Sequence, residues 1–123
     1  MKKAVFLDRD GVLNKLVLNP STREYEPPHS PEDLIIFPDV IESLKILQNS
    51  GFGLFLVTNQ PDYAKGKSSL EGLHAVHARF HDTLTSEGIH FLEYFFTIIT
   101  TRMGLFLDIL LPATAENLIH ISI

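Results

Sequence analysis

Two carboxylates near the N-terminus are the residues of this chain best suited to chemistry. Asp8 and Asp10 directly follow the apolar residues 5–7, and Gly11 comes next. Side chains two positions apart on an extended segment point to one face, so both carboxylates could address a single point. Paired carboxylates suit a hard divalent cation such as Mg²⁺, and Gly11 allows a sharp turn after them. A strand end with solvated aspartates is the alternative interpretation.

A second polar group follows another apolar run. Thr58, Asn59 and Gln60 come after residues 52–57, which are nearly all apolar and therefore indicate a strand buried on both faces. The Thr58 hydroxyl and the Asn59 amide are suited to binding phosphate oxygens. A capped turn explains the same T-N-Q-P sequence, so this segment alone leaves both interpretations open.

A strand, a helix and a second strand must position these two polar groups. Strands are predicted over residues 3–7 and 52–57, with a helix between them that opens at Pro38 and Asp39 and ends at residues 49–51. This order implies parallel strands joined by a right-handed connection. Since parallel strands place their carboxyl ends at one edge of the sheet, the two polar groups are expected to be neighbours.

The chain continues with a helix and a third strand. The S-x-x-E pattern that starts at Ser68 is typical of a capping box and predicts a helix that stops near residue 88, and a third strand is expected to begin within residues 89–96. His74, His77 and His81 share one side of that helix. Their spacing resembles that of metal ligands, but we interpret them as residues of the helix surface.

A long connection follows the paired aspartates. Residues 14–38 contain several proline turn signals, and a loop of this length in a small domain is often functional. The connection could therefore shape or cover a substrate pocket. Arg23 and Tyr25 are its candidates for facing a substrate, although a solvated loop explains either residue equally well.

Composition narrows the class of protein. The 123 residues are 45% hydrophobic and 20% charged, with a net charge of −5; this favours one globular domain and disfavours nucleic acid as a partner. The absence of cysteine excludes disulfides and thiolate metal sites. The N-terminal run is neither a signal peptide nor a membrane span. We therefore expect a cytoplasmic protein without a membrane partner and leave its oligomeric state open.

Together these segments resemble the haloacid-dehalogenase (HAD) superfamily of phosphohydrolases. Residues 8–14 fit D-x-D-G-x-[IL]-N, residues 57–60 read V-T-N-Q, and residues 64–67 read A-K-G-K. This combination is similar to the branch of histidinol phosphatases and D-glycero-D-manno-heptose 1,7-bisphosphate 7-phosphatases. The resemblance covers about residues 3 to 95. It implies a Rossmann-like α/β fold, with helices flanking a parallel sheet.

The resemblance also implies a role for each polar residue. Asp8 would be the nucleophile that attacks phosphorus and forms an aspartyl-phosphate, and Asp10 the general acid and later the base. Mg²⁺ would bind the Asp8 carboxylate and the Asp10 backbone carbonyl. Thr58 would hydrogen-bond the transferring phosphoryl group, with Asn59 and Gln60 supporting phosphate or substrate.

The tail departs from the family pattern. The resemblance requires a lysine beside the phosphate, within a C-x-C-R-K-P segment that also supplies zinc ligands, and a late aspartate that completes the Mg²⁺ site. Residues 97–123 contain no lysine or cysteine, and their only acids are Asp108 and Glu116. We therefore divide the chain into residues 1–96, the N-terminal part of a HAD phosphatase domain that is incomplete at its C-terminus, and a divergent tail over residues 97–123.

A shifted reading frame would explain this tail. If the last base of each codon is paired with the first two of the next, residues 112–118 can spell C-N-C-R-K-P and residues 99–105 can spell H-H-P-N-G-V. These are the segments of the family's zinc loop, in the family's order. Our hypothesis is a frameshift near residues 95–97, in the gene or in its sequencing, that truncates the domain. The alternative is a divergent C-terminal strand and helix.

Three functions follow from the resemblance. The first is Mg²⁺-dependent hydrolysis of a phosphomonoester in a small sugar phosphate of the heptose bisphosphate type, in which this chain is impaired because the lysine and the late aspartate are missing. The second is a non-catalytic phosphate-binding remnant or interaction domain. The third is a phosphatase for histidinol phosphate or for a nucleic-acid 3′-phosphate, and the acidic balance of the chain disfavours the nucleic acid.

Overall fold

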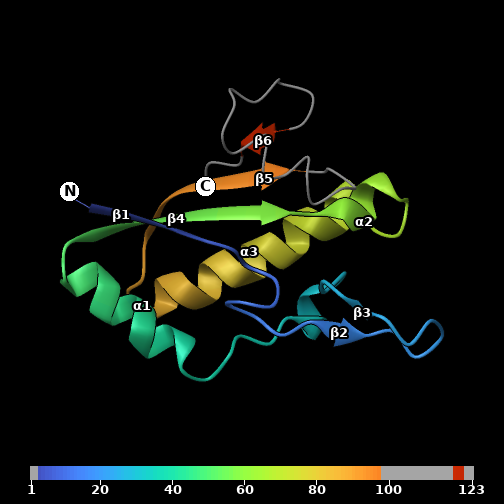
Figure 1. The fold of residues 1–123 in the computed structure, drawn as a ribbon, viewed down its shortest axis with the longest axis horizontal. Coiled ribbons are helices and arrows are strands. Elements are labelled where there is room, and N and C mark those ends of the chain that lie inside the picture. The colour runs from blue at the N-terminus through green and yellow to red at the C-terminus, as the bar shows by residue number, and fades with distance from the viewer. Residues whose placement is uncertain (1–2, 98–117, 121–123) are drawn as a thin grey trace.

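A four-stranded sheet organises the chain in the computed structural model, which describes residues 3–97 and 118–120 (Figure 1). The strands lie in the order β1 (Lys3–Leu7), β4 (Phe52–Asn59), β5 (Phe91–Thr97) and β6 (Leu118–His120). The first three are parallel, and β6 runs antiparallel to β5. The predicted α/β fold with a parallel sheet is confirmed, and the carboxyl ends of β1 and β4 do lie side by side.

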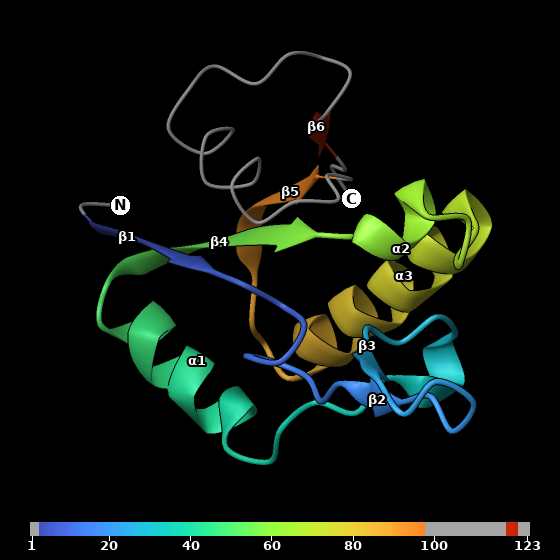
Figure 2. The ribbon, with the colours of Figure 1, turned by 45° about the vertical axis from the view of Figure 1, so that its right-hand side comes forward.

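Two crossover helices cover the same face of the sheet (Figures 1 and 2). Helix α1 (Val40–Asn49) joins β1 to β4, and α3 (Leu70–Ser86) joins β4 to β5. Helix α1 begins after Asp39, as predicted, and Gly51 follows its end with a φ of 90°. A side chain would be strained in this left-handed conformation, so glycine suits the turn into β4.

The long connection contains secondary structure that the sequence pattern did not predict. Strands β2 (Val17–Leu18) and β3 (Tyr25–Glu26) form an antiparallel hairpin, and a 3₁₀ helix, η1, spans Pro31–Asp33. A short helix, α2 (Pro61–Ala64), follows β4 directly. The connection contacts the helices that follow β4: His29 lies against Asp62 of α2, and η1 packs against α3 (Leu70–Ser86).

Two boundaries also differ from the prediction. Strand β4 extends through Thr58 and Asn59, so these residues belong to the strand and not to a turn. Helix α3 is capped by Ser69, whose Oγ accepts a hydrogen bond of 2.9 Å from the Gly72 amide. The cap is thus one residue later than the pattern starting at Ser68 predicted, because Ser69 is the residue with the extended backbone that a cap needs.

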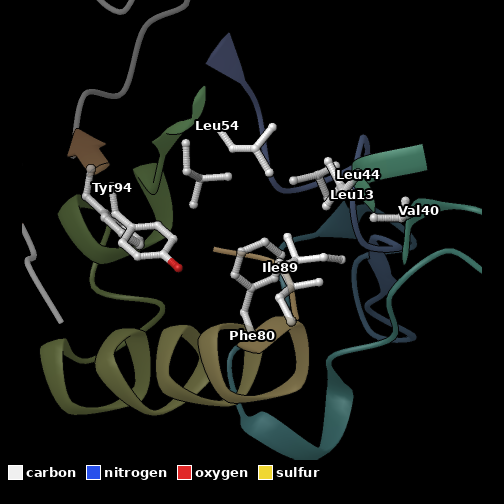
Figure 3. Close-up of a cluster of buried hydrophobic side chains, with 10 residues drawn as sticks. Leu13, Val40, Leu44, Leu54, Phe80, Ile89 and Tyr94 are labelled. Carbon is white, nitrogen blue, oxygen red and sulfur yellow. The ribbon is translucent and has the colours of Figure 1, made fainter. Parts of the chain in front are cut away.

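The core lies between the sheet and the two helices (Figure 3). Leu54 and Leu56 of β4 pack with Leu44 of α1 and with Phe80 and Leu84 of α3, and none of these side chains is more than 2% exposed. Burying one such side chain contributes about 1.5–3 kcal/mol. The opposite face is less covered: Phe6 is 63% exposed and stacks on Phe55 with their ring centroids 5.0 Å apart.

The division of the chain at residue 96 stays a prediction. The expected tail falls largely on residues 98–117 and 121–123, which lie outside the described residues.

Candidate active site

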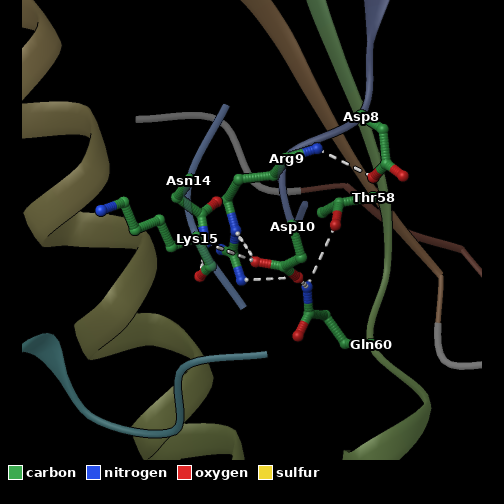
Figure 4. A network of polar contacts seen from close by, with 7 residues as sticks. All are labelled: Asp8, Arg9, Asp10, Asn14, Lys15, Thr58 and Gln60. Carbon is green, nitrogen blue, oxygen red and sulfur yellow. Dashed lines mark hydrogen bonds and ion pairs between the residues drawn. The ribbon is translucent and has the colours of Figure 1, made fainter. Parts of the chain in front are cut away.

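Three side chains hold the Asp10 carboxylate (Figure 4). Arg9 donates from Nε to Oδ1 at 3.1 Å and from Nη2 to Oδ2 at 3.3 Å. Asn14 Nδ2 donates to Oδ1 at 3.1 Å, and Gln60 Nε2 donates to Oδ2 at 2.6 Å. The Asp10 side chain is only 8% exposed. Since both oxygens accept hydrogen bonds, two of them from a guanidinium, the carboxylate is held in one orientation.

Arg9 belongs to this cluster, although it was not among the residues predicted from the sequence. Its side chain is fully buried, and the guanidinium lies over the Phe96 ring at 5.7 Å from the centroid. A buried guanidinium requires a partner of opposite charge, and Asp10 supplies it. Nη1 has no hydrogen-bond partner among the described residues. A basic residue between two acids at the end of an apolar run was the signal that could have identified this pair.

A tight turn brings Asn14 back to Asp10. The Arg9 carbonyl accepts hydrogen bonds from the amides of Val12, Leu13 and Asn14 at 2.8–3.2 Å. Gly11 lies inside this turn with a φ of 82°, a left-handed conformation that favours glycine. Strand β1 therefore ends at Leu7, before this turn.

This turn corrects the argument from strand alternation. Strand β1 ends at Leu7, so Asp8 and Asp10 are not two residues of one extended strand. Figure 4 shows the Asp8 carboxylate pointing away from the cluster around Asp10. The two side chains therefore do not converge on one point. The role implied for the Asp10 backbone carbonyl at a metal does not depend on that convergence and stays a prediction.

Asp8 is an exposed side chain at the carboxyl edge of the sheet. Its Oδ1 accepts a hydrogen bond of 2.8 Å from the Arg9 amide. Partial burial is the largest influence on this group and raises the pKa of Asp8, and the negative charge of Asp10 acts in the same direction. The Arg9 amide and the Thr58 hydroxyl oppose this increase by hydrogen bonding to the carboxylate.

The three polar residues at the end of β4 differ in position. Thr58 and Gln60 are buried, and Gln60 Nε2 donates both to Asp10 and to Thr58 Oγ1, the latter at 3.0 Å. Asn59 follows the strand's alternation, and its Oδ1 accepts a hydrogen bond of 3.0 Å from Thr97 Oγ1 on β5. The structure thus brings Thr58 and Gln60 to Asp10, and it places Asn59 beside Thr97.

The other candidates of the sequence lie elsewhere. Arg23 and Tyr25 are exposed in the region of the β2–β3 hairpin, Tyr25 by 68%. The interpretation of all three histidines of α3 as surface residues was wrong for His77, which is 1% exposed. It packs edge-on against Tyr94 and Phe96, with ring centroids 4.4 and 4.9 Å apart. Burial lowers the pKa of His77 to about 3.

No helix within the described part of the chain is long and apolar enough to cross a membrane.

Comparison with curated proteins finds relatives of one kind. The chain is 35% identical over 85 residues to a D-glycero-D-manno-heptose-1,7-bisphosphate 7-phosphatase of Thermosynechococcus vestitus, a match that covers 69% of this chain and 39% of the relative. It is 41% identical over 70 residues to the corresponding β-heptose enzyme of Vibrio cholerae, covering 57% of this chain and 33% of the relative. The matches thus span about two fifths or less of these relatives. No protein-family model matches the chain.

Solved structures show the same relationship at the level of the fold. A D,D-heptose 1,7-bisphosphate phosphatase from B. bronchiseptica, complexed with magnesium and phosphate, superposes with a TM-score of 0.68 at 24% identity, over 87% of this chain and 61% of that one. A protein of Mesorhizobium loti described as a HAD-like phosphatase superposes with a TM-score of 0.58 at 28% identity, over 72% of this chain and 39% of that one. From its relatives and its fold, the chain belongs to the haloacid-dehalogenase (HAD) superfamily.

Proposed function

We propose that this chain is part of an Mg²⁺-dependent phosphomonoesterase that acts on a small sugar phosphate of the heptose 1,7-bisphosphate type. One observation carries the proposal: an exposed Asp8 adjoins a firmly held Asp10 in a chain that is 35% identical to a heptose bisphosphate phosphatase. A nucleophile must be open to its substrate, whereas an acid and base must be held in one place.

In the proposed reaction, the Asp8 carboxylate attacks phosphorus and the bond to the sugar oxygen breaks. Asp10 gives a proton to that leaving oxygen and afterwards takes one from the water that cleaves the aspartyl-phosphate. Arg9, Asn14 and Gln60 orient the Asp10 carboxylate for both transfers. Through Gln60, the Thr58 hydroxyl is fixed at the same edge of the sheet, where it could hydrogen-bond the phosphoryl group.

The donors present at this edge fit Mg²⁺. The Asp8 side chain offers an exposed carboxylate and Asp10 offers a backbone carbonyl, and Mg²⁺ prefers such oxygen ligands together with water and phosphate oxygens. When bound, the ion would offset the negative charge of the phosphate that an anionic nucleophile has to approach.

We further propose that the chain as it stands is impaired, because its tail is out of frame from about residue 97. The tail contains neither the lysine nor the cysteines that the resemblance requires. The missing lysine also favours a second candidate function, a remnant that binds phosphate without turning it over. Sequencing the gene downstream of the codon for Phe96 tests the frameshift, which is refuted if the shifted frame does not encode C-x-C-R-K-P.

Turnover separates the two functions. Heptose 1,7-bisphosphate and p-nitrophenyl phosphate are offered with Mg²⁺ to this chain, to a version with the tail in the shifted frame, and to that version carrying Asp8→Asn. We expect the reframed chain to be at least about 100-fold faster than this chain, since one lost charge-stabilising donor costs that much, and the Asp8→Asn version to be inactive. An inactive reframed chain would refute the phosphatase; equal rates would refute the impairment.

A further inference from the structure

A second group of potential metal ligands lies outside the candidate active site. Glu26 of β3, His29 and Asp62 of α2 each offer one ligand atom, and these atoms all lie within 4.8 Å of one another. His29 Nε2 and Asp62 Oδ2 are 2.7 Å apart. The β2–β3 hairpin, which Figure 2 shows below α2, carries Glu26, and His29 follows this hairpin in the chain. Because Asp62 belongs to α2, two parts of the chain that are distant in sequence meet in this group.

The two carboxylates of this group are largely withdrawn from water. The side chains of Asp62 and Glu26 are 7% and 12% exposed, and that of His29 is 31% exposed. Lys67 is the nearest charged partner of Glu26, at 3.7 Å, and its own side chain is 40% exposed. An exposed lysine at this distance compensates only weakly for buried negative charge. A cation bound between these side chains would therefore offset negative charge that Lys67 leaves largely uncompensated.

Hydrogen bonds from neighbouring groups also hold Glu26 and Asp62 in position. Asn19 Nδ2 donates to Glu26 Oε1 at 3.1 Å, as the supporting residues of metal carboxylates commonly do. The Asp62 carbonyl accepts from the amides of Lys67 and Ser68 at 2.8 and 3.3 Å, which fixes the backbone that carries its side chain. Ligand atoms around an ion bound at about 2.0–2.2 Å lie about 3–4 Å apart, and the three atoms here, all within 4.8 Å of one another, are close to that spacing.

We propose that Glu26, His29 and Asp62 bind a divalent transition-metal ion, with Zn²⁺ as the best match. One imidazole nitrogen and two carboxylates form a mixed set that suits such ions, whereas Mg²⁺ prefers oxygen alone. The partly exposed His29 provides the entry path, and water would complete the coordination. A bound ion would fasten the β2–β3 hairpin to α2, two residues after the Gln60 that holds Asp10. The proposal is independent of the proposed phosphatase activity.

Zn²⁺ titration tests the proposal in excess Mg²⁺, which would occupy the oxygen site proposed at Asp8. Binding is measured by calorimetry, and the imidazole nitrogen shifts of His29 are followed by ¹⁵N NMR. We expect one Zn²⁺ per chain and a shift of the His29 Nε2 signal. His29→Gln and Asp62→Asn should each weaken binding more than about 100-fold, beyond the loss typical of supporting residues. The matched control His74→Gln, on the exposed side of α3, should leave binding unchanged.

Lys67→Met provides a second variant that keeps all three ligands. Because the Lys67 ammonium competes with a metal for Glu26, its removal should tighten Zn²⁺ binding, by up to about fivefold for an exposed ion pair. Absence of Zn²⁺ binding overturns the proposal, as does undiminished binding to His29→Gln. It is equally overturned if NMR finds His29 doubly protonated in the presence of Zn²⁺, since the imidazolium would then be the cation that the carboxylates require.

Discussion

Replacing His77 by leucine should remove an acid-sensitive part of the chain's stability. Both ring nitrogens of His77 are buried without a hydrogen-bond partner among the described residues. Burial is the main reason that its pKa falls from 6.5 to about 3, and the Arg9 charge adds to the effect. The folded protein therefore keeps this imidazole neutral at pH values where the unfolded chain protonates it.

The sign and size of the effect follow from proton linkage. Between pH 6.5 and about 3 the unfolded chain binds a proton that the native His77 does not, so stability falls as the pH is lowered through this window. Each pH unit below 6.5 costs about 1.36 kcal/mol as long as the pH stays above the lowered pKa, so His77 should cost about 2 kcal/mol between pH 7 and pH 5. The raised pKa of Asp8 acts in the opposite sense, but it is common to both proteins and cancels in their comparison.

Urea unfolding at pH 7 and pH 5 measures this difference. The chain should lose about 2 kcal/mol more than His77→Leu over this interval, with an unchanged m-value. His74→Leu is the matched control, because His74 is exposed on the same helix, and it should behave like the parent chain. Equal losses in the parent chain and in His77→Leu would refute the reasoning, since the imidazole would then be protonated in the folded state too.

Two further predictions concern the turn after β1. Arg9→Met should destabilise the chain by about 3–5 kcal/mol, because it leaves the buried Asp10 carboxylate without its charged partner; thermal unfolding checks this, and the double variant with Asp10→Asn should recover part of the loss. Gly11→Ala should cost about 1–2 kcal/mol in urea unfolding through the left-handed φ of 82° alone, since an added Cβ would meet Leu16 only at an ordinary 3.7 Å. A neutral Gly11→Ala would show that the turn relaxes.

The strands of the sheet and its two crossover helices were predictable because each has a regular pattern of apolar residues or clear end signals. The apolar runs of β1 and β4 and the Asp39 and Gly51 signals of α1 all predicted elements close to those observed. The β2–β3 hairpin was not predictable in this way. Its strands contain two residues each, too few for an alternation of apolar and polar side chains to be recognised.

The candidate site was predictable as a set of residues but not as an arrangement. Asp10, Thr58 and Gln60 do meet, because parallel strands end at one edge. The inward orientation of Arg9 depends on a turn whose hydrogen bonds the sequence pattern does not reveal. His77 was predicted at the helix surface because histidine is a polar residue. Its position, however, falls on the buried side of α3 together with Leu73, Val76 and Phe80.

The one-sided pairing of β1 has a consequence for the order in which the native state opens. In the described sheet β1 hydrogen-bonds only to β4, and its Phe6 leaves 63% of its surface in water. Its amides should therefore exchange with solvent through local unfolding, at a lower free energy than those of β4, which is paired on both sides. Since Asp8 adjoins this strand, a phosphate ester bound there together with Mg²⁺ would slow hydrogen exchange in β1 more than in β4. Slower hydrogen exchange in the five residues of β1 would thus report that the ligand is bound.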